Sequence, residues 1–524
     1  MVAIKEGKDK NSKGGGLLAS AAVVSIMTLI SRVMGLVRDV VLARFLGVSA
    51  GTDAFFVAFR IPNFLRRLFA EGAFNQAFVP VLTEYKEQGP KAAAKELVDR
   101  VAGTLGFSLV TVTALGVMFA PFLIVLFAPG FGKDPVQQLL ATEMLRLTFP
   151  YLFFIALTAF SGSILNTWGR FAVPAFTPVL LNISLIAAAL VLAPLFPEER
   201  MAVALAWGVL IAGMLQLLLQ LPFLARLGLM PAPKVAFKDP GVKKIMALMA
   251  PALFGVSVSQ INLLLDTVLA SLLETGSVTW LYYSDRLMEL PLGLFAIAIG
   301  TVILPSLSAN HAAASKEAFS RTLDWGVRLV VLLAVPAAVA LMVLSDTLLA
   351  ALFYYGEFSL HDVSQSAKAL RAYSLGLLAF MLIKVLAPGF FAQQNTRTPV
   401  RIGIIAMVAN MVFNLMLVWH YRHVGLALAT AASAWLNAAM LWRGLRQQGV
   451  YQPSSEWRFI LPRLTVAVLL MGVVVHWLAV RTDVWVTGAA FERALALLAI
   501  VAVGGATYLG SLMLLGLRVR HLKR

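Results

Sequence analysis

Long apolar runs are the feature that most constrains this chain, because a soluble fold cannot bury so many of them. An α-helix needs about 20 consecutive apolar residues to cross the roughly 30 Å hydrocarbon core of a bilayer. Fourteen such runs follow one another along the 524 residues. The pattern predicts an all-α integral membrane protein with fourteen transmembrane helices, expected at 17–46, 54–82, 98–128, 138–166, 172–195, 202–225, 243–272, 279–308, 322–346, 367–391, 399–419, 424–442, 459–480 and 492–516.

The composition agrees with a bilayer environment. The chain is 60% apolar and 13% charged, whereas an average soluble domain is about 25% charged. Lys and Arg outnumber Asp and Glu by 43 to 26, and in so apolar a chain we expect this surplus to meet anionic lipid rather than nucleic acid. There is no cysteine, which excludes disulfides and thiolate sites. Walker A, HExxH, GxSxG and dinucleotide motifs are also absent, so the sequence predicts a transporter and no enzyme.

The basic residues between the runs predict an orientation. The first run follows several lysines, as in a signal peptide, but no small-residue cleavage site comes after it, so we interpret it as a retained helix. Lys and Arg are concentrated in alternate loops, among them 83–97 and 226–242, and the intervening loops hold few. Because cytoplasmic loops carry the excess of positive charge, we expect both termini to be cytoplasmic.

An internal repeat predicts two related halves. Three local features recur at one offset of 225 residues: Gly51-Thr52 as Gly276-Ser277, Pro80 as Pro305, and Pro174 as Pro399. Six runs per copy give both halves the same topology, as in transporters built from parallel repeats. The expected organisation is a cytoplasmic extension at 1–16, a lobe at 17–226, a second lobe at 227–447, and two further helices with a basic cytoplasmic tail at 448–524.

Ionisable residues inside the apolar runs are the candidate substrate site. An arginine in mid-membrane costs about 2.5–3.5 kcal/mol on insertion scales, so such residues face a cavity or a partner. Together with Arg60 and Arg67, the cations exceed the anions, which predicts a hydrated cationic cavity between the first, second and eighth runs for an anionic head group. Buried ion pairs that hold helices together are the alternative. The candidate residues are Arg32, Arg38, Asp39, Arg66, Asp285, Arg286 and Glu289.

Two further patterns bear on transport. Gly35 and Pro62-Asn63 fall within runs, where irregular backbone often lines a cavity; a simple proline kink is the alternative at Pro62. Asp266, Asn410, Asn414 and Thr430 offer oxygen atoms in the seventh, eleventh and twelfth runs. These four form a candidate site for a monovalent cation, Na⁺ or H⁺, and no other cofactor is expected. Hydrogen bonding between helices, at about 0.6 kcal/mol per contact, is the alternative.

Four segments carry a family resemblance. They are SRVMGLVRDVVLARFLG (31–47), TDAFFVAFRIPNFLRRLFAEGAFNQAFVPVLTEYK (52–86), ILNTWGRFAVPAFTPVLLNIS (164–184) and YYSDRLMELPLG (282–293). The chain resembles the MurJ/MviN lipid II flippases of the MOP superfamily over nearly its whole length. The resemblance implies two six-helix lobes plus two C-terminal helices, in the cytoplasmic (inner) membrane of a bacterium.

The resemblance also implies a substrate and its binding residues. Lipid II, an undecaprenyl-pyrophosphate-linked disaccharide-pentapeptide, is flipped to the outer leaflet by alternating access for peptidoglycan synthesis. Family members use arginines that correspond to Arg32, Arg38, Arg66 and Arg286, accompanied by Asp39 and Asp285. Membrane lipids and wall-synthesis enzymes are the further partners implied. The last two helices, with Gly504-Gly505, are associated with a groove for the lipid tail; plain packing against lipid is the alternative.

Three other functions compete with this one. A flippase for another polyprenyl-linked glycan, or a multidrug exporter, shares the transporter class, and competition by the glycan would separate them. A scaffold that recruits wall-synthesis enzymes has no need of surplus arginines in the membrane. A membrane-embedded polymerase is disfavoured because the acidic residues lack metal-ligand spacing.

Overall fold

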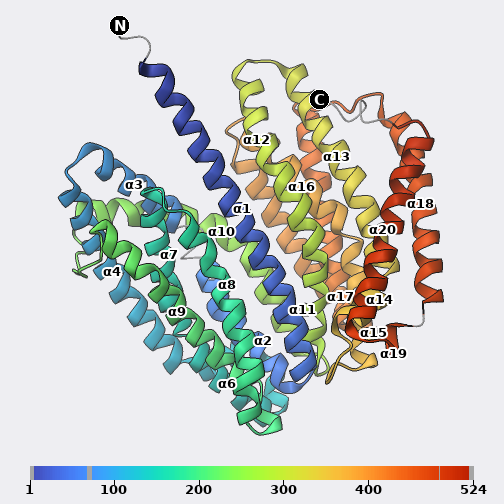
Figure 1. Ribbon diagram of the computed structural model, residues 1–524, viewed down its shortest axis with the longest axis horizontal. Helices are drawn as coiled ribbons and strands as arrows, with labels where there is room; N and C mark the ends of the chain where they lie inside the picture. The colour runs from blue at the N-terminus through green and yellow to red at the C-terminus, as the bar shows by residue number, and fades with distance from the viewer. Residues whose placement is uncertain (1–4, 68–73, 483, 518–524) are drawn as a thin grey trace. The chain divides into compact units, whose positions relative to one another are not determined.

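A computed structural model describes residues 5–67, 74–482 and 484–517, and the chain divides into two compact units, Met1–Val268 and Leu269–Arg524. The first unit is built of helices, and Figure 1 shows α1 lying alongside α8. Its α-helices are α1 (Lys5–Leu46), α2 (Ala50–Arg66), α3 (Phe74–Gln88), α4 (Lys91–Met118), α5 (Ala120–Phe127), α6 (Pro135–Thr148), α7 (Tyr151–Thr167), α8 (Ala172–Ala187), α9 (Val203–Leu227) and α10 (Pro240–Ser271). The last of them, α10, begins in this unit and ends at Ser271, just beyond the unit's last residue, Val268.

The second unit is helical as well. In it α11 packs against α15, and α13 and α17 both pack against α16. Its α-helices are α11 (Ser277–Pro291), α12 (Ile297–Ala312), α13 (Lys316–Val343), α14 (Ser345–Phe353), α15 (Leu360–Ser374), α16 (Leu377–Phe391), α17 (Arg397–Gln447), α18 (Trp457–Arg481), α19 (Val484–Thr487) and α20 (Ala490–Leu514). No strand occurs in either unit within the residues that the structure describes.

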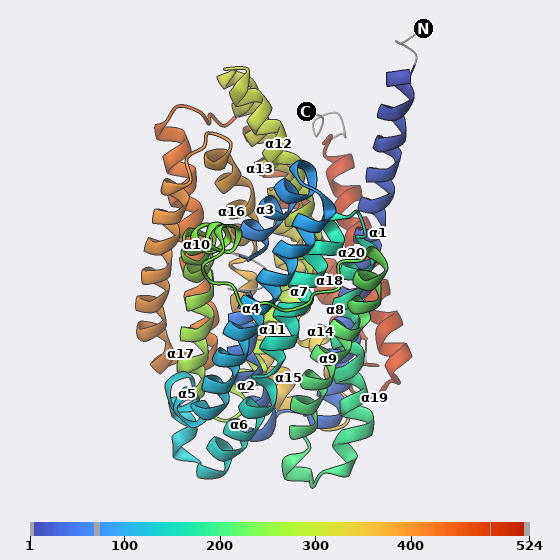
Figure 2. The ribbon, with the colours of Figure 1, turned by 90° about the vertical axis from the view of Figure 1, so that its left-hand side faces the viewer.

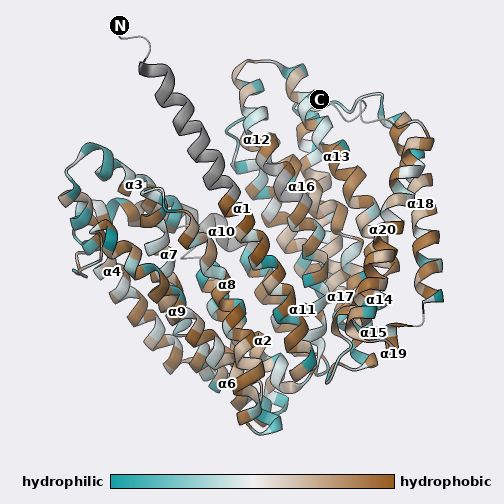
Figure 3. Cartoon of the chain, viewed as in Figure 1, coloured by the Kyte–Doolittle hydropathy of each residue, from teal (hydrophilic) through white to brown (hydrophobic). Residues whose placement is uncertain are grey.

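Nine helical stretches among the described residues are long and apolar enough to span a bilayer. One of them, Arg397–Gln447, covers two expected runs: the backbone turns at Arg422, where φ is 51° and ψ is −132°. Close packing follows this turn, since a Cβ on Gly425 would lie 2.5 Å from the carbonyl oxygen of Leu417. Apolar residues alternate with fewer polar ones along these helices (Figure 3), and the mean hydropathy of each stretch is high. The chain is therefore an all-α membrane protein.

Local sequence explains where several helices begin. Ser49 precedes α2 and forms a capping box with Thr52, in which the side-chain oxygen of each residue accepts a hydrogen bond from the backbone N–H of the other. Ser359 and Asp362 make the same arrangement at the start of α15. Both boxes satisfy backbone N–H groups that the first helical turn leaves without partners.

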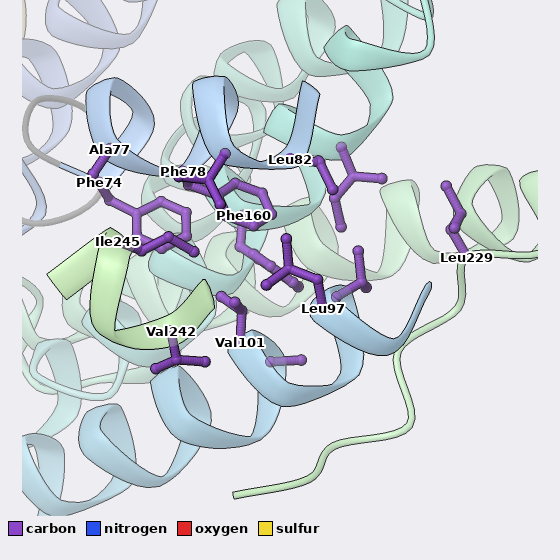
Figure 4. Packing of buried hydrophobic residues seen from close by; sticks show 14 of the residues in the cluster. Phe74, Ala77, Phe78, Leu82, Leu97, Val101, Phe160, Leu229, Val242 and Ile245 are labelled. Carbon is purple, nitrogen blue, oxygen red and sulfur yellow. The ribbon is translucent and has the colours of Figure 1, made fainter. Parts of the chain in front are cut away.

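The cores are formed by side chains that the apolar runs bring together. In the first unit, Phe74 and Phe78 of α3 stack at 5.0 Å between ring centroids, and Phe160 of α7 lies 5.1 Å from Phe78 (Figure 4). Residues of α4 and α10, among them Val101 and Ile245, pack in the same cluster. Figure 2 shows α7 next to α9 in this unit.

The repeated residues occupy similar places in the two units. Pro80 lies inside α3 and Pro305 inside α12. Gly51 is in the first turn of α2, and Gly276 caps α11. The lobe boundaries expected from the sequence stay predictions.

At the C-terminal end, α18 is tied to α13 by Asp324. The Asp324 Oδ1 accepts a hydrogen bond of 2.8 Å from Trp457 Nε1 and one of 3.1 Å from the hydroxyl of Tyr451. Burial and the neighbouring Asp324 carboxylate raise the pKa of Tyr451, so its hydroxyl remains a donor. Between α18 and α20, a Cβ on Gly504 would lie 2.6 Å from a methyl of Val475. Gly504 therefore serves close helix packing.

Candidate substrate site

Arg38 and Asp39 form a buried ion pair on α1. Arg38 is 7% exposed and Asp39 3%. Nε and Nη2 of Arg38 donate to the Oδ1 of Asp39 at 2.9 and 2.6 Å. A charged donor and acceptor make a hydrogen bond about twice as strong as a neutral pair. Arg32, about two turns earlier on α1, is exposed, and Arg38 is a partner of Asp39 although the two are adjacent in the chain.

Asn182 of α8 connects this pair to the rest of α1. Its Oδ1 accepts from Arg38 Nη1 at 3.1 Å, and its Nδ2 donates to the carbonyl oxygen of Ser31 at 3.0 Å. The sequence analysis missed Asn182; the available signal was a polar amide within an apolar run. Gly35 of α1 lies beside this amide, and a Cβ on it would make an ordinary van der Waals contact of 3.8 Å with Asn182 Nδ2.

The expected breaks at Gly35 and Pro62-Asn63 are wrong. The α1 helix is continuous from Lys5 to Leu46. Pro62 lies inside α2, which continues to Arg66. The backbone thus stays helical at both positions, because a single glycine lowers helix propensity without ending a helix and a proline in a helix can be accommodated as a kink.

The arginines of α2 have separate environments. Arg60 Nη1 donates to Thr267 Oγ1 of α10 at 2.6 Å. Arg66 Nε donates to Asn63 Oδ1, one turn earlier, at 2.8 Å. Arg66 also lines a cavity with Tyr151. Glu71, an acidic residue of the second apolar run, lies outside the described residues.

Arg286 of α11 pairs with its own helix. Its Nη1 lies 3.2 Å from the Oε2 of Glu289, and its guanidinium carbon lies 5.0 Å from the ring centre of Tyr282. The Arg286 and Glu289 side chains are 39% and 44% exposed. Ion pairs of such exposure contribute about 0–1 kcal/mol, so the pair of Arg286 with Glu289 adds little to stability. Asp285 is half-buried on the same helix.

The candidate cation ligands divide between the units. Asp266 is half-buried on α10 of the first unit. In the second, Asn410 Nδ2 donates to Thr430 Oγ1 at 3.4 Å and to Ser433 Oγ at 3.3 Å. Asn414 Nδ2 donates to Asn410 Oδ1 at 3.0 Å. The structure thus joins three of the four residues, adds Ser433, and shows the helix-to-helix hydrogen bonds that the alternative interpretation requires.

A polar cavity of about 370 Å³ lies among α2, α3, α7, α8 and α9 of the first unit. Arg66 and the glutamines Gln216 and Gln220 line it. The sequence analysis missed both glutamines, although two amides four residues apart in an apolar run place polar groups on one helix face.

Comparison of folds defines the class of protein. The chain matches a solved multidrug resistance MATE family transporter of the MOP superfamily, in an inward-facing conformation, with a TM-score of 0.66 and 15% identity over 82% of this chain and 98% of that one. At this identity the likeness shows the fold alone. That protein is a membrane transporter, and this chain shares its fold.

Closer relatives define the family. The family model for lipid II flippase MurJ matches residues 42–496. A probable lipid II flippase MurJ of Vibrio cholerae is 52% identical over 97% of this chain and 98% of its own, and the lipid II flippase MurJ of Burkholderia cenocepacia is 43% identical over 97% and 99%. A solved lipid II flippase MurJ in an inward closed conformation has a TM-score of 0.78 and 27% identity over 96% and 100%. The chain belongs to the lipid II flippase MurJ family.

Proposed function

We propose that this protein flips lipid II from the inner to the outer leaflet of the bacterial cytoplasmic membrane by alternating access, for peptidoglycan synthesis. The observation that carries the proposal is the match to curated lipid II flippases along nearly the whole chain, at up to 52% identity. The chain performs no bond-making step in this scheme, and we infer no enzymatic activity.

The arginines supply the physical basis of the proposal. A pyrophosphate cannot enter hydrocarbon without replacing its hydration shell. Guanidinium groups replace it well, because their planar N–H donors match phosphate oxygens in pairs. We assign substrate binding to Arg32, Arg38, Arg66 and Arg286, with Asp39, Asp285 and Glu289 orienting them. Arg38, 7% exposed with its Nη1 on Asn182, has the best-defined geometry of these residues.

The topology and energetics complete the proposal. We infer fourteen spans in two six-helix lobes, 17–226 and 227–447, followed by two helices, with both termini in the cytoplasm. Lys and Arg in alternate loops support this orientation. We further propose coupling to Na⁺ or H⁺ through Asp266, Asn410, Asn414 and Thr430. The close grouping of Asn410, Asn414 and Thr430 supports it.

A leaflet-accessibility assay tests the function. In cells depleted of this protein, lipid II should accumulate where an externally added, membrane-impermeant lipid II-cleaving toxin cannot reach it, and re-expression should restore cleavage. Arg38→Ala, expressed at the same membrane level, should fail to restore it. Unchanged cleavage during depletion, in a strain without a second flippase, would exclude lipid II as the cargo.

A further inference from the structure

The second unit contains a strained turn in the middle of α17. Arg422 has φ 51° and ψ −132° there, a sparsely populated backbone conformation that persists only where surrounding contacts hold it. The turn lies between the expected spans 399–419 and 424–442, on the side that the proposed orientation places outside the cytoplasm. The groups that hold the turn therefore experience the pH of the outer side.

His423, the residue after Arg422, is buried against two neighbouring helices. Its side chain belongs to a residue that is 2% exposed. Its Nε2 lies 3.1 Å from the carbonyl oxygen of Gln365 on α15, and its ring centre lies 5.1 Å from that of Trp280 on α11. Arg422 adds an ion pair of 2.7 Å with Glu274, just before α11. These contacts hold the turn of α17 against α11 and α15.

The Gln365 carbonyl fixes where the His423 ring carries its proton. A carbonyl oxygen can only accept, so Nε2 carries a hydrogen and donates it. The other ring nitrogen, Nδ1, is buried and has no hydrogen-bond partner among the described residues. In the neutral ring Nδ1 is therefore a bare acceptor. A second proton would bind at this atom and would create a buried N–H donor without an acceptor, which is costly.

No carboxylate in the described part of the second unit pairs with the His423 ring. Asp362 of α15 instead accepts a hydrogen bond of 2.8 Å from Trp280 Nε1. His361 is exposed and contacts the Trp280 ring at 5.6 Å between ring centres. Trp280 itself is tilted by 51° to His423, and an aromatic face is the one nearby group that favours a cation. Protonation would thus place a charge without a counter-ion in a buried site.

The other ionisable neighbours do not reverse this preference. Burial is the main influence and lowers the pKa of His423; the Gln365 carbonyl and Glu274 raise it by less, and Lys368 and Arg422 lower it further. Glu274 is already paired with Arg422. The packed conformation therefore favours the neutral ring.

We propose that His423 is a pH-sensitive switch at the outer end of the second unit. The neutral ring holds the α17 turn against α11 and α15, and acid on the outer side favours a conformation in which the turn separates from them and the ring is exposed. The inference goes beyond lipid flipping, because it gives the transporter a response to external acidity. Its sidedness rests on the proposed orientation.

The direction and size of the response follow from linkage. An exposed histidine titrates near a pKa of about 6.5, whereas the buried ring remains neutral there. As the pH falls through this value, the open conformation binds a proton that the packed one does not, so the packed conformation loses stability in acid. Between about pH 7.5 and about pH 5.5 the equilibrium should move about tenfold toward the open conformation.

A single buried cysteine measures the opening. Ala427 lies one turn after His423 on the same face of α17 and is fully buried, and Ala427→Cys supplies the only thiol of the chain. Its rate of reaction with a thiol reagent is measured on purified protein in detergent, with and without His423→Gln. Glutamine keeps an N–H donor for the Gln365 carbonyl and carries no charge. The ratio of the two rates cancels the intrinsic pH dependence of the thiol, and should rise about tenfold in acid.

His361→Gln is the matched control. It removes the exposed histidine that also contacts Trp280 but leaves the buried ring in place, so the rate of Ala427→Cys should be the same with and without it at every pH. If His423→Gln does not accumulate, Gln447→Cys, at an exposed position near the end of α17, serves as the reference for Ala427→Cys, and the same rise is expected.

The outcomes decide both the switch and its side. A ratio that stays flat would refute the switch, and one that falls in acid would show that Trp280 stabilises the charged ring in the packed conformation. In intact cells, acid medium should raise labelling of Ala427→Cys by a membrane-impermeant reagent relative to the His423→Gln background; no rise would refute sensing of the outer pH. The labelling requires no lipid II, so its failure leaves the proposed function standing.

Discussion

Asn182 on α8 holds Arg38 on α1: the Asn182 Oδ1 accepts from Arg38 Nη1 at 3.1 Å, while its Nδ2 donates to the Ser31 carbonyl oxygen at 3.0 Å. One amide therefore contacts α1 at two points that are seven residues apart, on one face. The contact orients a guanidinium whose other nitrogens bind Asp39. Asn182 is in this sense a positioning residue for a proposed substrate ligand.

Replacing Asn182 should impair flipping more than stability. Asn182→Leu leaves Arg38 without one buried acceptor, a cost of about 1–3 kcal/mol, and lets its side chain turn. We expect at least a tenfold slower flipping rate in proteoliposomes, with membrane abundance preserved. Asn182→Asp keeps an acceptor for Arg38 and should retain part of the rate.

The matched control is Thr148→Val. Thr148 is fully buried and donates to the Ala58 carbonyl oxygen of α2 at 3.1 Å, so this variant also removes a helix-to-helix hydrogen bond but touches no proposed ligand. Equal losses of rate in Asn182→Leu and Thr148→Val would reduce Asn182 to helix packing.

Arg286 should be required for binding and dispensable for folding. Its pair with Glu289 is half-exposed and contributes about 1 kcal/mol at most. Arg286→Ala should abolish complementation at normal abundance. Arg286→Lys keeps the charge but not the paired donors, and should retain partial function. Growth restored by adding Glu289→Gln to Arg286→Ala would instead identify a structural salt bridge.

The proposed cation site predicts an ion-dependent phenotype. Asp266→Asn removes the single carboxylate of the set, and should lower flipping and its dependence on an Na⁺ or H⁺ gradient while the protein folds normally. Flipping rates in proteoliposomes with each gradient imposed in turn provide the measurement. A variant that flips at the wild-type rate under both gradients would leave Asn410, Asn414 and Thr430 with a packing role alone.

The orientation can be tested cleanly because the chain has no cysteine. Single cysteines at the exposed positions Gln88 and Lys238 should react only with thiol reagents that enter the cytoplasm. Lys133→Cys, at the exposed end of a short 3-10 helix that is expected on the other side, should react with an impermeant reagent in intact cells. Labelling of Gln88→Cys or Lys238→Cys from outside would reverse the topology.

The helical membrane architecture could be predicted from the sequence, because hydrophobic length is a local property. A run of about 20 apolar residues crosses a bilayer as an α-helix, because every backbone polar group must find its hydrogen bond within the segment. The family could also be recognised from the sequence, since its motifs are contiguous. The chemistry of the site was visible too: arginines such as Arg38 and Arg66 stand out among apolar neighbours.

Which groups meet was decided by tertiary structure alone. Asn182 lies 144 residues from Arg38, and no spacing rule connects them. That Gln216 and Gln220 of α9 donate to Thr177 of α8, and that their side-chain oxygens accept no hydrogen bond from the described residues, follows only from how these two helices pack. Gly35 illustrates the same limit: its sequence suggested a break, whereas α1 runs through it without interruption. The hydrophobicity of a segment depends only on its own residues, but hydrogen-bond partners depend on which helix faces come together.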